Sequence, residues 1–192
     1  MKKIILLLAA AATICSCNPY KNDPVAQAIE KTTLANYPDQ PHRFRFQKLE
    51  KIDSTVFRTE VDRRIGTFET KIRKNKELYN KYMRTGYTVN ADIKKQTLMN
   101  DSVILLKLHA LKEEMGSKLD EVAYYDYKFT AFGKVGDIPF DLIDYYATVT
   151  PDNECLTISE DINAVHRATG KVLPGYMEIV KTIAVEGEET EE

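Results

Sequence analysis

After residue 17, three histidines and one cysteine are the side chains best suited to catalysis or metal binding. His42, His109 and His166 stand far apart in the chain, and none belongs to an HExxH or HxH pair. A zinc site needs three or four converging ligands, and the neighbouring residues supply none. Cys155 and a histidine would make a nucleophile and its base, but no family signature surrounds this cysteine, which favours a small buried strand residue. The sequence therefore predicts no catalytic residue, no metal site and no cofactor.

Charged residues are unevenly distributed. Residues 135–161 contain no Lys or Arg but seven acids, at positions 137, 141, 144, 152, 154, 160 and 161. A calcium loop of the EF-hand type needs acids at alternate positions around a central glycine, and this spacing favours a solvated surface instead. Residues 58–84 carry nine Lys or Arg against four acids. These cations surround the exposed side of a helix instead of forming the single basic face of a membrane-binding helix. The net charge of −2 is too mild for a nucleic-acid partner.

Tyrosine gives the best candidate for a binding site. The chain has eleven tyrosines and no tryptophan, and five of the tyrosines fall in 124–127 and 145–146. In residues 124–135 the odd positions are the more apolar, so the even positions should face outward. The same parity in 142–150 predicts that Tyr124 and Tyr146 share an outward face, where aromatic rings stack on sugars or anchor a protein. The alternative is that tyrosine is simply favoured in strands.

The apolar periodicity predicts the elements that hold these residues. A helix should begin at Asp23–Pro24 and end near Tyr37, followed by a strand from 43 towards 57. Apolar stripes predict a long antiparallel helix pair at about 59–84 and 91–120. Strands are expected at 124–135, 142–150 and 155–159, then a short helix to 168 and a last strand at 177–185. This order predicts an α+β domain with an antiparallel sheet packed by helices on one face. The leading helix and late meander loosely resemble cystatin-like and NTF2-like folds, a resemblance that implies no activity.

The start of the chain resembles a bacterial lipoprotein signal. Two lysines precede a short apolar run from 4 to 12, and Ile14-Cys15-Ser16-Cys17 then resembles a lipobox. The resemblance implies a signal peptide at 1–16, a diacylglycerol and a further acyl chain such as palmitate on Cys17, and a tether at 17–23. We expect a single domain at 24–185 and an acidic disordered tail at 186–192. Asn18 in place of Asp implies the outer membrane, and the few acids after Cys17 favour the periplasmic side over the cell surface.

In signal, size and tether the chain resembles the small lipoproteins of Bacteroidetes-type bacteria. We therefore expect a non-enzymatic envelope lipoprotein, held to the membrane by Cys17, that binds an envelope protein or glycan through the sheet face of Tyr124 and Tyr146. One alternative is an anchored enzyme whose site is assembled from distant residues, which a deep pocket holding His166 or Cys155 would favour. Another is a structural or assembly factor that uses the helical pair, which an apolar patch along these helices would favour.

Overall fold

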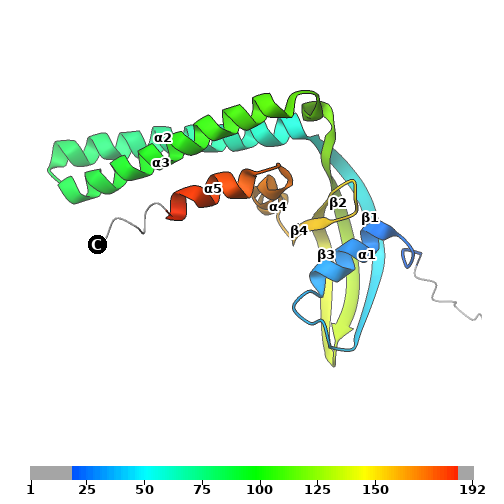
Figure 1. Ribbon diagram of the computed structural model, residues 1–192. Coiled ribbons are helices and arrows are strands. Elements are labelled where there is room, and N and C mark those ends of the chain that lie inside the picture. Colours follow the sequence, from blue (N-terminus) through cyan, green and yellow to red (C-terminus); the bar gives the residue numbers. More distant parts are fainter. Residues whose placement is uncertain (1–18, 186–192) are drawn as a thin grey trace, which may run out of the picture.

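The computed structural model describes residues 19–185, which form a sheet module and a long helical arm (Figure 1). The chain order is α1 (Pro24–Thr33), β1 (His42–Val56), α2 (Phe57–Thr85), α3 (Thr88–Met115), η1 (Gly116–Asp120), β2 (Val122–Val135), β3 (Ile138–Val149), β4 (Cys155–Ser159), α4 (Ile162–Ala168), η2 (Thr169–Val172) and α5 (Tyr176–Val185). The predicted α+β class, the antiparallel sheet and the long helix pair are confirmed. The predicted signal peptide, the lipid on Cys17 and the tail at 186–192 lie outside the described residues.

The sheet is an antiparallel meander with strand order β1-β2-β3-β4. One face packs against α1, whose Ile29 meets Phe46, Phe129 and Val149 in a buried cluster. Asp23 caps α1 as predicted, because its carboxylate accepts the amides of Val25 and Ala26 at 2.8 and 3.1 Å. On β2 the odd positions 127, 129 and 131 face α1. The even positions therefore face away from α1, in agreement with the predicted parity.

The helical arm is the hairpin of α2 and α3. Gly86 ends α2 in the left-handed conformation, with φ of 77°, which a glycine adopts without strain. Val61, Phe68 and Leu108 belong to the buried cluster between the two helices. The helix predicted to run to 120 ends at Met115, because the chain turns at Gly116 and continues as the 3-10 helix η1. No helix among residues 19–185 is both long and apolar enough to cross a bilayer.

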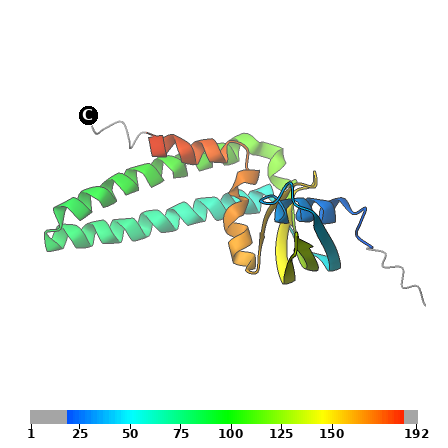
Figure 2. The same ribbon diagram turned by 90° about the horizontal axis from the view of Figure 1, so that it is seen from below.

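The last predicted element is wrong. Residues 176–185 form the helix α5 instead of a strand, and α5 lies along the arm (Figures 1 and 2). Tyr176 and Ile179, one helical turn apart, pack against the buried cluster of the arm. Their spacing of three was available in the sequence, but the alternation of Met177, Ile179, Ile183 and Val185 concealed it. The sequence of this short segment is compatible with both a strand and a helix, and the contact with the arm selects the helix.

Candidate functional site

A buried polar cluster joins the arm to the sheet. Glu60, in the first turn of α2, is 0% exposed, and its carboxylate accepts four hydrogen bonds from side chains. Arg63 Nη1 and Arg64 Nε donate at 2.7 Å each, and the Tyr124 hydroxyl donates at 3.0 Å. The Thr169 hydroxyl donates the fourth hydrogen bond at 3.0 Å, and Arg64 Nη2 forms an ion pair with the carboxylate at 2.5 Å. Ion pairs and hydrogen bonds together compensate the cost of burying this charge.

A second part of this cluster pairs a histidine with an aspartate. His166 Nε2 on α4 lies 2.8 Å from Asp126 Oδ2 on β2, and Thr148 on β3 donates to Asp126 Oδ1 at 3.0 Å. Arg64 also reaches this side, since its Nη2 donates to the His166 carbonyl at 2.7 Å. We call Glu60, Arg64, Tyr124, Asp126 and His166 the junction cluster. Its members lie on α2, β2 and α4, and Thr148 of β3 donates to Asp126, so its contacts fix the arm against the sheet.

The expectation that Tyr124 faces outward is wrong, because its side chain is 0% exposed. The parity of β2 is as predicted, but α2 begins directly after β1, so its first turn and α4 cover this end of the even face. Burial raises the pKa of the Tyr124 phenol above its ordinary value. Tyr124 belongs to the junction cluster and takes no part in an exposed surface.

Tyr146 lies on the same face but further from the arm, and its side chain is half-buried. Tyr146 on β3 is the cross-strand neighbour of Lys128 on β2, and the Lys128 ammonium lies 5.9 Å from the Tyr146 ring centroid. Lys128 also pairs with Asp144 at 3.0 Å. Lys128 lies four positions from Tyr124 along β2, about 13 Å at the usual rise. The structure therefore does not bring the two predicted tyrosines together as one contact surface.

The uncovered part of the sheet, which we call the open sheet face, is mixed in charge. Its exposed and half-buried members are Arg43, Arg45, Lys48, Glu50, Lys128, Thr130, Phe132, Lys134, Asp141, Asp144 and Tyr146. Lys48 pairs with Glu50 at 2.7 Å, whereas Arg43 and Arg45 have no ion-pair partner among the described residues. Beside these two arginines, Phe132 is exposed. This face can offer cations and one aromatic ring to a partner.

The arm carries a surface that the sequence interpretation overlooked. Val89, Met99, Val103 and Leu106 of α3 are 70, 56, 42 and 70% exposed. They belong to a row of positions spaced alternately three and four residues apart. We call this row the α3 seam: Val89, Asp92, Gln96, Met99, Val103, Leu106 and Ala110. This spacing is the heptad repeat with which a helix packs against another helix.

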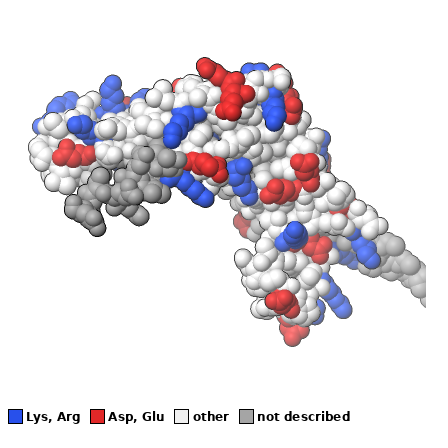
Figure 3. All heavy atoms as spheres, in the orientation of Figure 1, with Lys and Arg blue, Asp and Glu red and all other residues white. Residues whose placement is uncertain are grey.

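The seam lies on the side of α3 turned away from α2. Ile104, Leu108 and Leu111 make the packed side, so α3 is apolar on two opposite sides. In Figure 3 the charged side chains along the arm are separated by broad uncharged surface. The sequence contained this signal, because Val89, Met99, Val103 and Leu106 fall outside the stripe that predicts the core side of α3.

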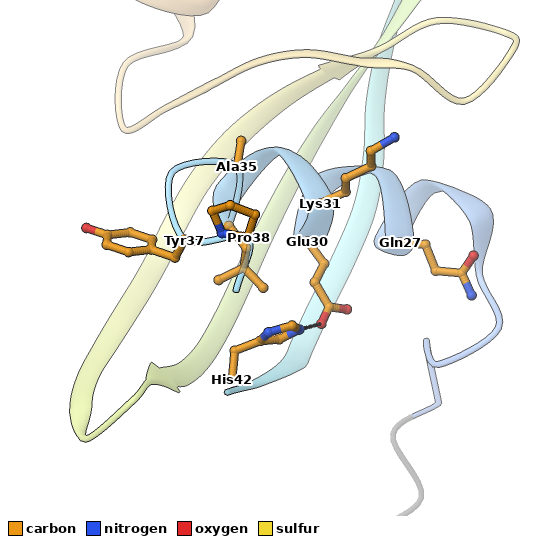
Figure 4. A pocket seen from close by; sticks show the side chains of 8 residues that line it. Gln27, Glu30, Lys31, Ala35, Tyr37, Pro38 and His42 are labelled. Atoms are coloured by element: carbon orange, nitrogen blue, oxygen red, sulfur yellow. Dashed lines mark ion pairs between the residues drawn. The ribbon is translucent and has the colours of Figure 1, made fainter. Parts of the chain in front are cut away.

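A hollow of about 600 Å³ lies between α1 and the start of β1 (Figure 4). Glu30 and His42 point towards each other there, with His42 Nε2 3.8 Å from the carboxylate, and Leu34, Tyr37 and Pro38 also line the hollow. Burial raises the pKa of Glu30. The hollow is open to solvent, and neither Cys155 nor His166 lines it.

The nucleophile and base considered from sequence do not form a pair. Cys155 packs in the cluster beneath α1, and burial raises the pKa of its thiol, which disfavours the reactive thiolate. His166 binds Asp126 on the opposite face of the sheet. His109 is exposed on α3, and within residues 19–185 no three His, Cys, Asp or Glu side chains converge as metal ligands. Asp137 and Asp144 pair with Lys134 and Lys128.

Comparisons of the chain with protein-family models, with curated proteins and with solved structures give no significant match. The likeness to cystatin-like and NTF2-like folds therefore stays a prediction. The described residues offer two exposed surfaces to a partner, the open sheet face and the α3 seam, whereas the junction cluster is mostly buried.

Proposed function

We propose that this protein is a lipid-anchored envelope protein that acts by docking a helical segment of a protein partner along its arm. The observation that carries the proposal is the α3 seam. Val89, Met99, Val103 and Leu106 are exposed at heptad positions, and a soluble helix with no partner has little reason to place large apolar residues there. An apolar row of this length and spacing fits another helix better than a sugar or a small ligand.

The shape of the molecule supports this role. The described chain begins beside α1 in the sheet module, and the tip of the α2–α3 hairpin lies at the opposite end (Figure 1). The 29 residues of α2 span about 43 Å at the rise of an α-helix. With lipid on Cys17, two residues before Pro19, the sheet module would lie near the outer membrane and the arm would extend away from it. The junction cluster would then hold the arm at a fixed angle.

Cross-linking from single positions tests the proposal. A photoactivatable amino acid at Leu106 or Met99 should give a discrete adduct in cell envelopes, with the cross-linked peptide mapping to a helix. The same probe at Lys74, on the exposed side of α2, is the matched control and should give none. Absence of an adduct at both seam positions, with the protein present and folded, would overturn the proposal. Mass spectrometry of the mature N-terminus tests the anchor, since acyl chains should be found on Cys17.

The open sheet face is a second candidate, favoured by two arginines that have no ion-pair partner within residues 19–185. Arg43 and Arg45 lie beside the exposed Phe132, and Tyr146 lies further along the same face. Such a surface fits an acidic glycan or an acidic protein segment. The double substitution Arg43→Ala and Arg45→Ala should weaken retention on an anionic polysaccharide. Retention equal to that of the parent protein would leave the sheet face without a binding role.

A further inference from the structure

We infer that the helix docked on the α3 seam is α3 of a second copy of this chain, running antiparallel. This inference rests on the function proposed above and names the partner. A two-fold axis beside residue 101 would place Met99 of each copy against Val103 of the other, and Gln96 against Leu106. Closed two-fold symmetry uses the same patch on both subunits, so one seam suffices for both. Three observations favour this partner.

The first observation is the charge of the seam. Asp92 is the one charged residue among the seven seam positions, and Lys107 stands next to the seam at its other end. In the antiparallel arrangement Asp92 of one copy lies against Ala110 of the other and within reach of its Lys107, so opposite charges meet twice. A parallel arrangement in register would instead place the two Asp92 carboxylates together, which is unfavourable at a closely packed position.

The second observation is a groove at the base of the arm. It encloses about 690 Å³ between α3 and the start of α5, and Lys107, Ala110 and Glu114 form its α3 side. Glu114 lies 13 residues after residue 101 and Val89 lies 12 residues before it, whereas Lys107 and Ala110 lie nearer to residue 101. The two-fold axis therefore brings the exposed Tyr87 and Val89 of one copy to the groove of the other. The tip of the hairpin in one copy would thus reach the part of the groove around Glu114 in the other copy.

The third observation is the amount of surface. The exposed parts of Val89, Met99, Val103 and Leu106 amount to apolar surface on the order of 400 Å² per copy. A stable interface buries roughly 800 Å² per partner. The seam and the polar residues that flank it therefore supply a contact of the usual size, and the groove adds to it.

Charge reversal in the full-length, membrane-extracted protein tests the inference. Asp92→Lys alone and Lys107→Asp alone should each weaken self-association at least tenfold, as measured by sedimentation in detergent. The two changes in one chain should restore it to within about threefold, because the opposite charges meet again. Lys74→Asp, on the exposed side of α2, is the matched control and should leave self-association unchanged.

Cysteine cross-linking tests the orientation. A copy with Gln96→Cys and a differently tagged copy with Leu106→Cys should be joined by a short cross-linker. Two Gln96→Cys copies should not, because the antiparallel arrangement separates them by about 15 Å along the helix. Cross-linking of Gln96→Cys to itself would overturn the antiparallel pairing.

The remaining outcomes separate this inference from the proposed function. The protein could be monomeric in the envelope while its Leu106 probe labels a helix of another protein. That result would overturn the inference that the partner is a second copy, and it would leave the proposed docking function standing. A Leu106 adduct to residues 186–192 of the same chain would overturn both, because the seam would then be covered by the chain itself. A dimer that survives both single charge reversals would also overturn the inference, since its contact would lie elsewhere.

Discussion

Tyr124 and Tyr146 lie on the same face of one sheet and yet occupy opposite environments. Tyr124 is fully buried and donates to the Glu60 carboxylate, whereas Tyr146 is half-buried beside Lys128 on the open sheet face. The difference comes from α2 and α4, which cover only the end of this face next to the arm. Strand parity tells which face a side chain takes, but only the tertiary packing tells whether that face meets solvent.

Substitution of Glu60 is the sharpest test of the difference between the two ends, because the buried contacts at the covered end converge on its carboxylate. Glu60→Ala should lower the free energy of unfolding by about 3–5 kcal/mol, because Arg64 is left as a buried cation without its partner. Glu69→Ala, an exposed glutamate two turns later on α2, should change it by about 0.5 kcal/mol or less. Urea unfolding followed by circular dichroism measures both. Equal effects would mean that the junction cluster adds no stability.

The two tyrosines give the next largest contrast. Tyr124→Ala should cost about 3 kcal/mol or more, since it removes a fully buried ring and a donor to a buried carboxylate. Tyr146→Ala, on the half-buried ring, should cost about 1 kcal/mol or less. The melting temperatures of the two variants give the comparison directly. A larger loss for Tyr146→Ala would reverse the assignment of covered and open ends.

Much of the fold could be predicted from local signals. Asp23 before Pro24, the helical stripe from Val61 and the alternation from Tyr125 each require only neighbouring residues. The junction cluster could not be predicted in this way, because it joins Glu60 to Tyr124 and Thr169, far apart in the sequence. Glu60 with Arg63 and Arg64 did carry a signal, as charged residues flanking the buried Val61 at helical spacing. The α3 seam was equally visible, but one apolar stripe on that helix already accounted for its core side.

His166 tests how far the junction extends beyond Glu60. His166→Ala leaves the buried Asp126 carboxylate with Thr148 as its one side-chain donor among the described residues, and should cost about 1–3 kcal/mol. His42→Ala removes a longer and more exposed pair with Glu30, and should cost about 0.5 kcal/mol or less. Equal losses would show that the pairing of His166 with Asp126 contributes no more than a surface contact.

The pH dependence of stability offers a smaller contrast. Burial raises the pKa of Tyr124 in the folded protein above the value of about 10 in an unfolded chain. The folded state thus holds the phenol proton more tightly, so this contribution is complete below pH ~10 and is lost as the pH rises towards the folded pKa. Tyr124→Phe should therefore flatten the alkaline loss of stability, measured by urea unfolding at a series of alkaline pH values. An unchanged alkaline slope in Tyr124→Phe would contradict the burial of the phenol.

The smallest effect on the free energy of unfolding is expected from Arg45, on the open end of the sheet. Arg64, on the covered end, is the arginine to compare with it. Arg45 is exposed and has no ion-pair partner among the described residues, so Arg45→Ala should change the free energy of unfolding by about 0.5 kcal/mol or less. Arg64 is buried and donates to Glu60, to the carbonyl of His166 and to Thr169, so Arg64→Ala should cost about 3 kcal/mol or more. An exposed cation that is indifferent to folding is free to serve a partner. If the open sheet face binds an acidic glycan, Arg45→Ala should weaken that binding and reduce its dependence on salt. A large loss of stability in Arg45→Ala would show that this end of the sheet is covered as well, and the contrast between the two ends would fail.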